Sequence, residues 1–217
     1  MKEKPNEWVS ISDLMAGVMA VVMLLLVLSV LQNKFAALKR EQEKNQSVQT
    51  AQQRMVDMLK SMQTTMDEQG ESGLVSFDLA GSKITLRDRI FARGSACVTD
   101  EARHALSRLG AKVAEFVNGS TQAQVFVEGH TDNVLVTRPV TDFGKFCTVY
   151  DDNFTLSAAR AREARKLLIQ MLDEQQAKRV IVAGFGDSQP LPGIEPGDER
   201  NRRVEVQFLN RPSARTL

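Results

Sequence analysis

WVSISDLMAGVMAVVMLLLVLSVL occupies residues 8–31. Between residues 9 and 31 its only charged side chain is that of Asp13. At a rise of about 1.5 Å per residue, a helix of this length crosses a hydrocarbon core of roughly 30 Å. The stretch therefore predicts one membrane-spanning helix over residues 8–32, preceded by a short N-terminus at 1–7.

Asp13 is the informative residue of this helix. It shares one helical face with Ser10, Gly17 and two alanines, and such small side chains let another helix approach closely. An intramembrane carboxylate costs on the order of 2.5 to 3.5 kcal/mol at the bilayer centre, so it usually faces a partner, a cavity or an ion path. We expect Asp13 to face a bundle formed with other chains. Alternatively, it lies near the headgroups, about 7 Å from Trp8 along the axis, and only marks the membrane boundary.

Composition narrows the function classes. The 217 residues carry a net charge of +1 without a basic block, so the electrostatic footprint of a nucleic-acid-binding protein is missing. The apolar run is longer than the core of a usual signal peptide and is followed by QNKFAALKR, which has no A-x-A-like cleavage site. These features predict a retained membrane anchor.

Residues 33–72 are mostly polar and contain neither proline nor glycine before Gly70, which favours a continued helix. A stripe at helical spacing runs through this segment: Met55, Met58, Leu59, Met62 and Met66. The stripe could pack a short dimer coil, lie against a partner or cover the folded domain. We favour a helical tether with some self-association; a plug over an ion channel is the alternative.

Residues 73–210 have the pattern of an α+β domain, followed by a tail at 211–217. Apolar runs at 74–79 and 84–86 flank Gly81 and Ser82, which predicts a hairpin. Helices are expected from Thr99 to about Asn118 and from Ser157 to about Glu174, and strands at 124–128, 179–183 and 203–209. This β-α-β-α-β order predicts a two-layer domain, with a mixed sheet and both helices on one face.

Arg160 and Asp132 are the candidate binding residues. If Ser157 caps its helix, Arg160 falls in the first turn, where the helix dipole disfavours a cation, so an anion is expected beside it. Asp132 follows the preceding strand and could bind an ammonium group. A zwitterionic amino acid head group would satisfy both residues. Alternatively, Arg160 and Asp132 pair with each other, and Arg202 and Arg203 brace the same loops.

Four separated motifs carry a family resemblance. They are GHTD at 129–132, Asn153 with Leu156, Ser157, Arg160 and Ala161, the turn at 184–186, and Asn201 with Arg202 and Arg203. With these motifs, residues 84–209 resemble the OmpA-like peptidoglycan-binding domain. The resemblance implies that Asp132 and Arg160 hold the diaminopimelate group of a peptidoglycan stem peptide, and that Asn153 and Arg202 line or support the pocket.

The chain departs from this family at 133–152, where NVLVTRPVTDFGKFCTVYDD is inserted. The insertion could reshape or cover the pocket. A wall-binding domain would lie in the periplasm, where an oxidising environment permits a disulfide. We therefore expect a Cys97–Cys147 bridge that ties the insertion to the hairpin loop.

A membrane helix with one acid, a tether and an OmpA-like domain together resemble the B subunit of ion-driven stators. This resemblance implies a single-pass inner-membrane protein with a cytoplasmic N-terminus and a periplasmic C-terminal domain. It also implies a homodimer inside a ring of membrane A subunits, expected to be a pentamer, in which Asp13 takes and releases a proton or a sodium ion. Ser10 and Gly17 would support Asp13.

The segment WVSISDLMAGVM resembles the B subunits of the Zorya anti-phage defence system more than those of flagellar stators. A flagellar or transport stator subunit is the alternative, and a static OmpA-like envelope tether is another. An enzyme is not expected, because His104 and His130 lack a cysteine, serine or metal-ligand arrangement around them. No cofactor and no metal are expected.

Overall fold

The computed structural model describes residues 7–68, 70 and 73–210, and it describes no side chains at 7–13, 44, 47–48 and 51. The tail predicted at 211–217 and most of the predicted N-terminus lie outside the described residues, as do the side chains of Ser10 and Asp13. The chain divides into two compact units, Met1–Gln52 and Gln53–Leu217. The second unit therefore starts earlier than the domain predicted at 73–210, and the predicted tether at 33–72 is divided between the units.

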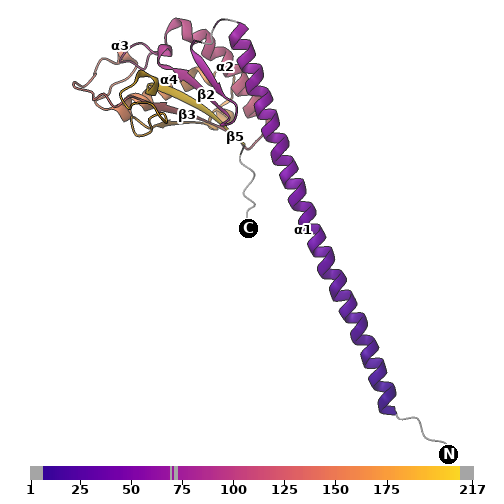
Figure 1. Cartoon of the computed structure of the whole chain (residues 1–217). Helices are drawn as coiled ribbons and strands as arrows, with labels where there is room; N and C mark the ends of the chain where they lie inside the picture. The colour runs from indigo at the N-terminus through magenta and orange to yellow at the C-terminus, as the bar shows by residue number, and fades with distance from the viewer. Residues whose placement is uncertain (1–6, 69, 71–72, 211–217) are drawn as a thin grey trace, which may run out of the picture. The chain divides into compact units, whose positions relative to one another are not determined.

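Helix α1 (Glu7–Glu68) supplies the regular structure of the first unit (Figure 1). Among the described residues it is the one helix long and apolar enough to cross a membrane, within Leu14–Glu43. Its large apolar side chains in this region, such as Leu24 and Leu25, are exposed. An apolar surface of this size needs a covering partner or lipid, which agrees with the span predicted at 8–32.

The last turns of α1 belong to the second unit, and there the methionine stripe has a clear role. Met55, Leu59, Met62 and Met66 are buried and join the core cluster of the folded domain. Our favoured interpretation of the stripe, self-association of the tether, is therefore wrong for these residues. Instead, the stripe covers the folded domain, which is one of the alternatives given above. The apolar side chains find enough apolar surface within their own chain.

The domain contains one five-stranded sheet. Its strands are β1 (Val75–Asp78), β2 (Lys83–Arg87), β3 (Ala123–His130), β4 (Val180–Gly184) and β5 (Arg203–Asn210). Their spatial order is β1-β2-β5-β3-β4, with β3 and β4 parallel and the other neighbours antiparallel. The predicted hairpin at Gly81 and the mixed sheet are confirmed.

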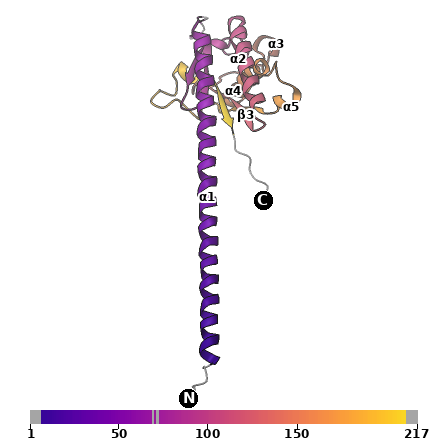
Figure 2. The ribbon, with the colours of Figure 1, turned by 90° about the vertical axis from the view of Figure 1, so that its right-hand side faces the viewer.

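The described part of the domain contains the two predicted helices and four short helical segments that were not predicted. They are η1 (Asp88–Ile90), α2 (Asp100–Gly119), α3 (Phe143–Phe146), α4 (Asn153–Leu168), α5 (Glu174–Ala177) and η2 (Glu199–Asn201). The hydroxyl of Thr99 accepts a hydrogen bond from Ala102 N and caps α2, as predicted. Helices α2 and α4 contact each other and pack on one face of the sheet (Figure 2). The fold is therefore the predicted two-layer α+β domain.

The second long helix differs from its prediction at both ends. Asp152, not Ser157, is the N-cap of α4, because its carboxylate accepts a hydrogen bond from Thr155 N at 2.6 Å. The helix ends at Leu168 rather than near Glu174, and Met171, which the predicted helix would have included, is exposed. The capping box of Asp173 starts the separate helix α5 instead.

Alternation along the strands gives the sheet two different faces. Val125, Val127, Val204 and Val206 are fully buried in the core beneath the helices. The residues between them, such as Glu128 and Glu205, belong to the opposite face, where register places these two glutamates side by side. The far face of the sheet is therefore polar and charged.

Two glycines allow α4 to lie directly on the parallel strands. A Cβ atom at Gly129 would collide with the backbone carbonyl of Ser157, and one at Gly184 would lie 2.6 Å from the Cβ of Ala158. Only glycine fits at such backbone approaches. The glycine of GHTD thereby brings the end of β3 close to α4, which carries Asn153 and Arg160.

Leu59→Ala tests whether the end of α1 is part of the domain. Leu59 is fully buried, so its truncation should lower the free energy of unfolding by about 2 to 5 kcal/mol. Urea unfolding of the full-length protein in detergent, followed by circular dichroism, measures this change. The neighbouring exposed residue supplies the control Lys60→Ala, which should be neutral. A neutral Leu59→Ala would contradict this packing.

Candidate functional site

Asp132 lies directly after β3, in a loop held by the turn at 184–186. The amide of Thr131 donates to Gly186 O at 2.8 Å, and the amide of Phe185 donates to Gly129 O at 2.9 Å. Asp132 is buried to all but 7% of its surface. Its carboxylate accepts a hydrogen bond from Arg202 Nη1 at 2.7 Å and one from Val134 N at 3.3 Å.

Asn153 supports this loop from the start of α4. Its side-chain amide donates to the backbone oxygens of Asp132, at 3.2 Å, and Val134, at 3.0 Å. Asn153 therefore holds the backbone on both sides of residue 133, while its own side chain is buried. The resemblance implied that Asn153 lines or supports the pocket, and its hydrogen bonds place it in a supporting role for the Asp132 loop.

Arg160 is almost completely buried, with 2% of its surface exposed. Its Nε donates to Ser95 O at 3.0 Å, its Nη1 lies 3.3 Å from Asp88 Oδ1, and its guanidinium lies 5.4 Å from the ring centroid of Phe91. Nη1 makes no hydrogen bond despite its ion pair. Burial lowers the pKa of Arg160, and the neighbouring Asp88 opposes that shift. The guanidinium therefore faces the Asp88 carboxylate as an ion pair that lacks hydrogen-bond geometry at Nη1.

The helix-dipole argument for Arg160 was wrong. Because α4 starts at Asn153, Arg160 lies inside the helix and not in its first turn. Ser157 is an interior residue whose hydroxyl accepts a hydrogen bond from Gly186 N at 2.9 Å. The surroundings of the guanidinium are therefore set by its burial beside Asp88 and Ser95, not by a helix end.

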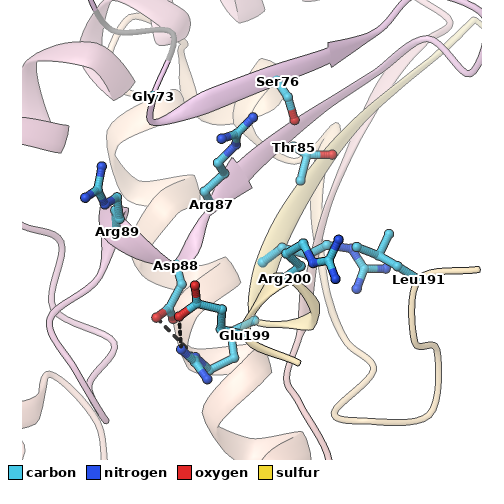
Figure 3. A pocket seen from close by; sticks show the side chains of 11 residues that line it. Gly73, Ser76, Thr85, Arg87, Asp88, Arg89, Leu191, Glu199 and Arg200 are labelled. Carbon is cyan, nitrogen blue, oxygen red and sulfur yellow. Dashed lines mark hydrogen bonds and ion pairs between the residues drawn. The ribbon is translucent and has the colours of Figure 1, made fainter. Parts of the chain in front are cut away.

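Asp88 and Arg202 connect the two candidate binding residues. Asp88 projects from the end of β2 (Figure 3), and its Oδ2 lies 3.1 Å from Arg202 Nε. Arg202 in turn binds Asp132, so charges alternate along the series Arg160, Asp88, Arg202, Asp132. Among the ion pairs of the described residues, none joins Asp132 directly to Arg160. The alternative in which these two residues pair with each other is therefore wrong.

Sequence reasoning missed Asp88. An acid after a strand is usually an ordinary loop residue, and Asp88 lies far in sequence from GHTD and from α4. The one signal in the sequence that could have pointed to Asp88 was its position between Arg87 and Arg89, where one carboxylate has a guanidinium group on each side. Ser95 gave no signal, because it contributes only a backbone oxygen to Arg160.

The inserted segment 133–152 is fastened to the loop that carries Ser95. Cys147 forms a disulfide with Cys97, and the backbone oxygen of Phe146 accepts hydrogen bonds from Ala96 N and Ser95 Oγ, both at 3.0 Å. Tyr150 donates its hydroxyl to Gly94 O at 2.6 Å. These contacts fasten the loop that supplies Ser95 O to Arg160.

Glu128, His130 and Glu205 form a separate group on the polar sheet face. Their possible ligand atoms all lie within 4.8 Å of one another, which resembles a cation site. However, the carboxylate oxygens of Glu205 are engaged by Lys83 at 2.7 Å and Arg203 at 2.6 Å. Burial would raise the pKa of Glu205, but these two cations outweigh it and lower the pKa. We therefore assign the group to an ion-pair network rather than to a metal centre.

The predicted membrane site belongs to the first part of α1. Ser10 and Asp13 are part of α1, but their side chains lie outside the described residues. Gly17 is exposed, and a Cβ atom there would meet nothing within 4 Å. The small-residue face at Gly17 is therefore open within this chain.

The family model for the OmpA family matches residues 90–203, which include His130, Asp132, Asn153, Arg160 and Arg202. The chain belongs to the OmpA family. A search of curated proteins found no significant match.

Solved structures agree with this OmpA-family fold. The cell wall anchor of the T6SS from Pseudomonas aeruginosa is 30% identical, with a TM-score of 0.50 over 68% of this chain and 94% of that one. A protein described as MotB-like from Desulfovibrio vulgaris is 23% identical, with a TM-score of 0.53 over 74% and 99%. The periplasmic domain of Helicobacter pylori MotB is 17% identical, with a TM-score of 0.49 over 64% and 83%.

We expect His130 to make the OmpA-family domain sensitive to acid. Burial, followed by the charge of Arg203, lowers its pKa from 6.5 to about 4; Glu205 opposes this shift and Lys83 adds to it. Between these pKa values the unfolded chain binds more protons than the folded chain, so stability rises with pH. Acidification from pH 7 to 4.5 should therefore lower the free energy of unfolding by about 2 to 3 kcal/mol through the titration of His130.

Unfolding of wild type and His130→Phe at several pH values measures this contribution. The difference between the two proteins cancels the titration of Glu128, whose pKa burial raises. His130→Phe should flatten the slope between pH 4.5 and 6.5, whereas His104→Ala, at the other and exposed histidine, should keep it. Parallel slopes for wild type and His130→Phe would contradict the assignment.

Proposed function

We propose that this chain is a peptidoglycan-anchored inner-membrane subunit of an ion-driven stator complex that acts in anti-phage defence. The observation that carries the anchor role is the OmpA-family domain with a buried Arg160 guanidinium, which a series of three ion pairs connects to Asp132. The names of two structural neighbours, a cell wall anchor and a MotB-like protein, agree with this role.

The geometry suggests how a diaminopimelate group would bind. A ligand carboxylate would take the position of Asp88 at Arg160, and a ligand ammonium would take that of Arg202 at Asp132. Asp88 and Arg202 already pair with each other at 3.1 Å, so they can stay neutralised after displacement. Charge-assisted pairs of this kind favour a zwitterionic head group over a singly charged one. Asn153 would keep the Asp132 loop in place.

The membrane end of the proposal depends on Asp13. A carboxylate in a narrow, partly dry helix bundle can change charge during ion transfer, and about 2.3 kcal/mol is available per charge per 100 mV. We propose that two copies of this chain lie within a ring of membrane A subunits, and that wall anchoring lets the ring move against them. The segment WVSISDLMAGVM supports the assignment to Zorya-type defence complexes.

A static cell-wall tether is the second candidate function. It is favoured by the T6SS cell wall anchor, whose 30% identity exceeds that of the two MotB-type structures. Such a tether would share the wall-binding site, and Asp13 would contact a partner without carrying an ion. The two candidate functions therefore differ only at the membrane end.

Binding to purified sacculi tests the anchor role. Asp132→Asn and Arg160→Lys in the full-length detergent-solubilised protein should each weaken binding by at least about tenfold. Asp132→Asn removes the negative charge that would pair with the ammonium of the head group, and Arg160→Lys removes the planar pair of donors that would bind its carboxylate. Asp100→Asn and Arg103→Lys change an exposed ion pair on α2 and serve as matched controls. Undiminished binding by both folded site variants would refute the assignment of the pocket.

Asp13→Asn tests the ion-carrying role. In cells that also contain the membrane partner, the variant should abolish ion flux and protection against phage, because an amide cannot take up or release a proton at neutral pH. Co-purification with the partner and binding to sacculi should be retained. Glu41→Gln on the same helix is the control and should keep ion flux. Full function of Asp13→Asn would favour the static tether.

A further inference from the structure

An arginine-lined groove adjoins the candidate wall-binding pocket. It has a volume of about 670 Å³ and lies between the ends of β1 and β2 and the segment 191–203 (Figure 3). Its floor includes Ser76 and Thr85, which pair across the two strands, and Thr85 pairs in turn with Glu205. The groove therefore opens on the polar face of the sheet, away from α2 and α4.

The charge of the groove is strongly positive. Five arginines line it, Arg87, Arg89, Arg200, Arg202 and Arg203, against the two carboxylates of Asp88 and Glu199, which leaves an excess of three positive charges. The whole chain carries only +1. This concentration of guanidinium groups in a concave surface attracts anions.

Two of these arginines have no side-chain partner among the residues that the structure describes. Arg200 pairs with Asp198, Arg202 with Asp88 and Asp132, and Arg203 with Glu205. In contrast, the side chains of Arg87 and Arg89 are exposed, and neither has a hydrogen bond or ion pair within the described part of the chain. Figure 3 shows both on the same side of the groove, above Asp88. Their donors are therefore available to a ligand.

The groove is continuous with the pocket. Asp88 and Arg202 line the groove, and they are also the two central members of the series from Arg160 to Asp132. A ligand whose head group displaced them would have the rest of its length beside the groove. Carboxylates along that length would meet guanidinium groups in the geometry that favours paired hydrogen bonds.

We propose that this groove binds the free carboxylates of the peptidoglycan stem peptide beyond its diaminopimelate head group, with Arg87 and Arg89 as the anion contacts. This inference rests on the proposed wall-anchoring function and extends its site. Arg87 and Arg89 would then set specificity for peptides whose glutamyl α-carboxylate is free rather than amidated. Arg160 and Asp132 would still recognise the head group.

Titration of the full-length protein in detergent tests the groove. The probe is L-Ala-γ-D-Glu-meso-diaminopimelate, compared with free diaminopimelate. Arg87→Ala/Arg89→Ala should weaken tripeptide binding by about tenfold and change binding of free diaminopimelate by less than about twofold. Arg103→Ala/Lys112→Ala removes one exposed and one half-buried cation from α2, outside the groove, and should bind both ligands as wild type does.

An amidated tripeptide, with D-isoglutamine in place of D-glutamate, identifies the carboxylate. Amidation should weaken binding to wild type by about tenfold but should not affect Arg87→Ala/Arg89→Ala further, because the contact is already lost. Equal tripeptide affinity of wild type and a folded double variant would overturn the inference. So would a double variant that loses binding of inorganic pyrophosphate but not of tripeptide, since the groove would then be a phosphate site.

The failure of this inference and the failure of the proposed function give different results. If wild type binds tripeptide and the groove variant binds it equally well, only the groove assignment falls. If wild type binds neither tripeptide nor sacculi, the wall-anchoring function falls and the groove assignment falls with it.

Discussion

Burial of the Arg160 guanidinium is the constraint that organises the functional end of this domain. A cation with 2% of its surface exposed is costly unless anions and backbone oxygens surround it. Asp88 supplies the charge, Ser95 supplies a backbone oxygen, and Phe91 supplies an aromatic face. Each comes from the segment between β2 and α2, so this segment must fold against α4.

That requirement explains the structural role of the inserted segment. The loop that carries Ser95 is itself held by Phe146 and Tyr150 and by the Cys97–Cys147 disulfide. The insertion therefore supports Arg160 through this loop, whose Ser95 oxygen accepts the hydrogen bond from Arg160 Nε. The four charges from Arg160 to Asp132 are paired within the domain itself.

Much of the fold could be predicted because its signals are local. The hairpin around Gly81, the Thr99 cap of α2 and the β-α-β-α-β order depend on residues close in sequence, and all agree with the structure. The start of α4 could not be decided in this way, because Asp152 and Ser157 are both good caps. The packing of Gly129 and Gly184 on the helix backbone favours the longer helix from Asn153.

The candidate site was predicted only in part. GHTD and the residues from Asn153 to Arg160 could be found from their motifs, but Asp88 and the arginine groove could not. More than a hundred residues of sequence separate Arg87 and Asp88 from Arg202. Only the pairing of β2 with β5 brings them together. The packing partner of the methionine stripe could not be predicted for the same reason. The spacing of Met55 and Met62 defines an apolar face but does not show what that face packs against.

The sequence by itself determined that this chain has one long apolar helix with a single acid and an α+β domain with OmpA-family motifs, because periodicity, caps and motifs are properties of neighbouring residues. Only the tertiary structure decided the partner of each buried charge. The cost of burying a guanidinium is met by whichever anion the folded chain places beside it, and here that anion is Asp88 and not Asp132.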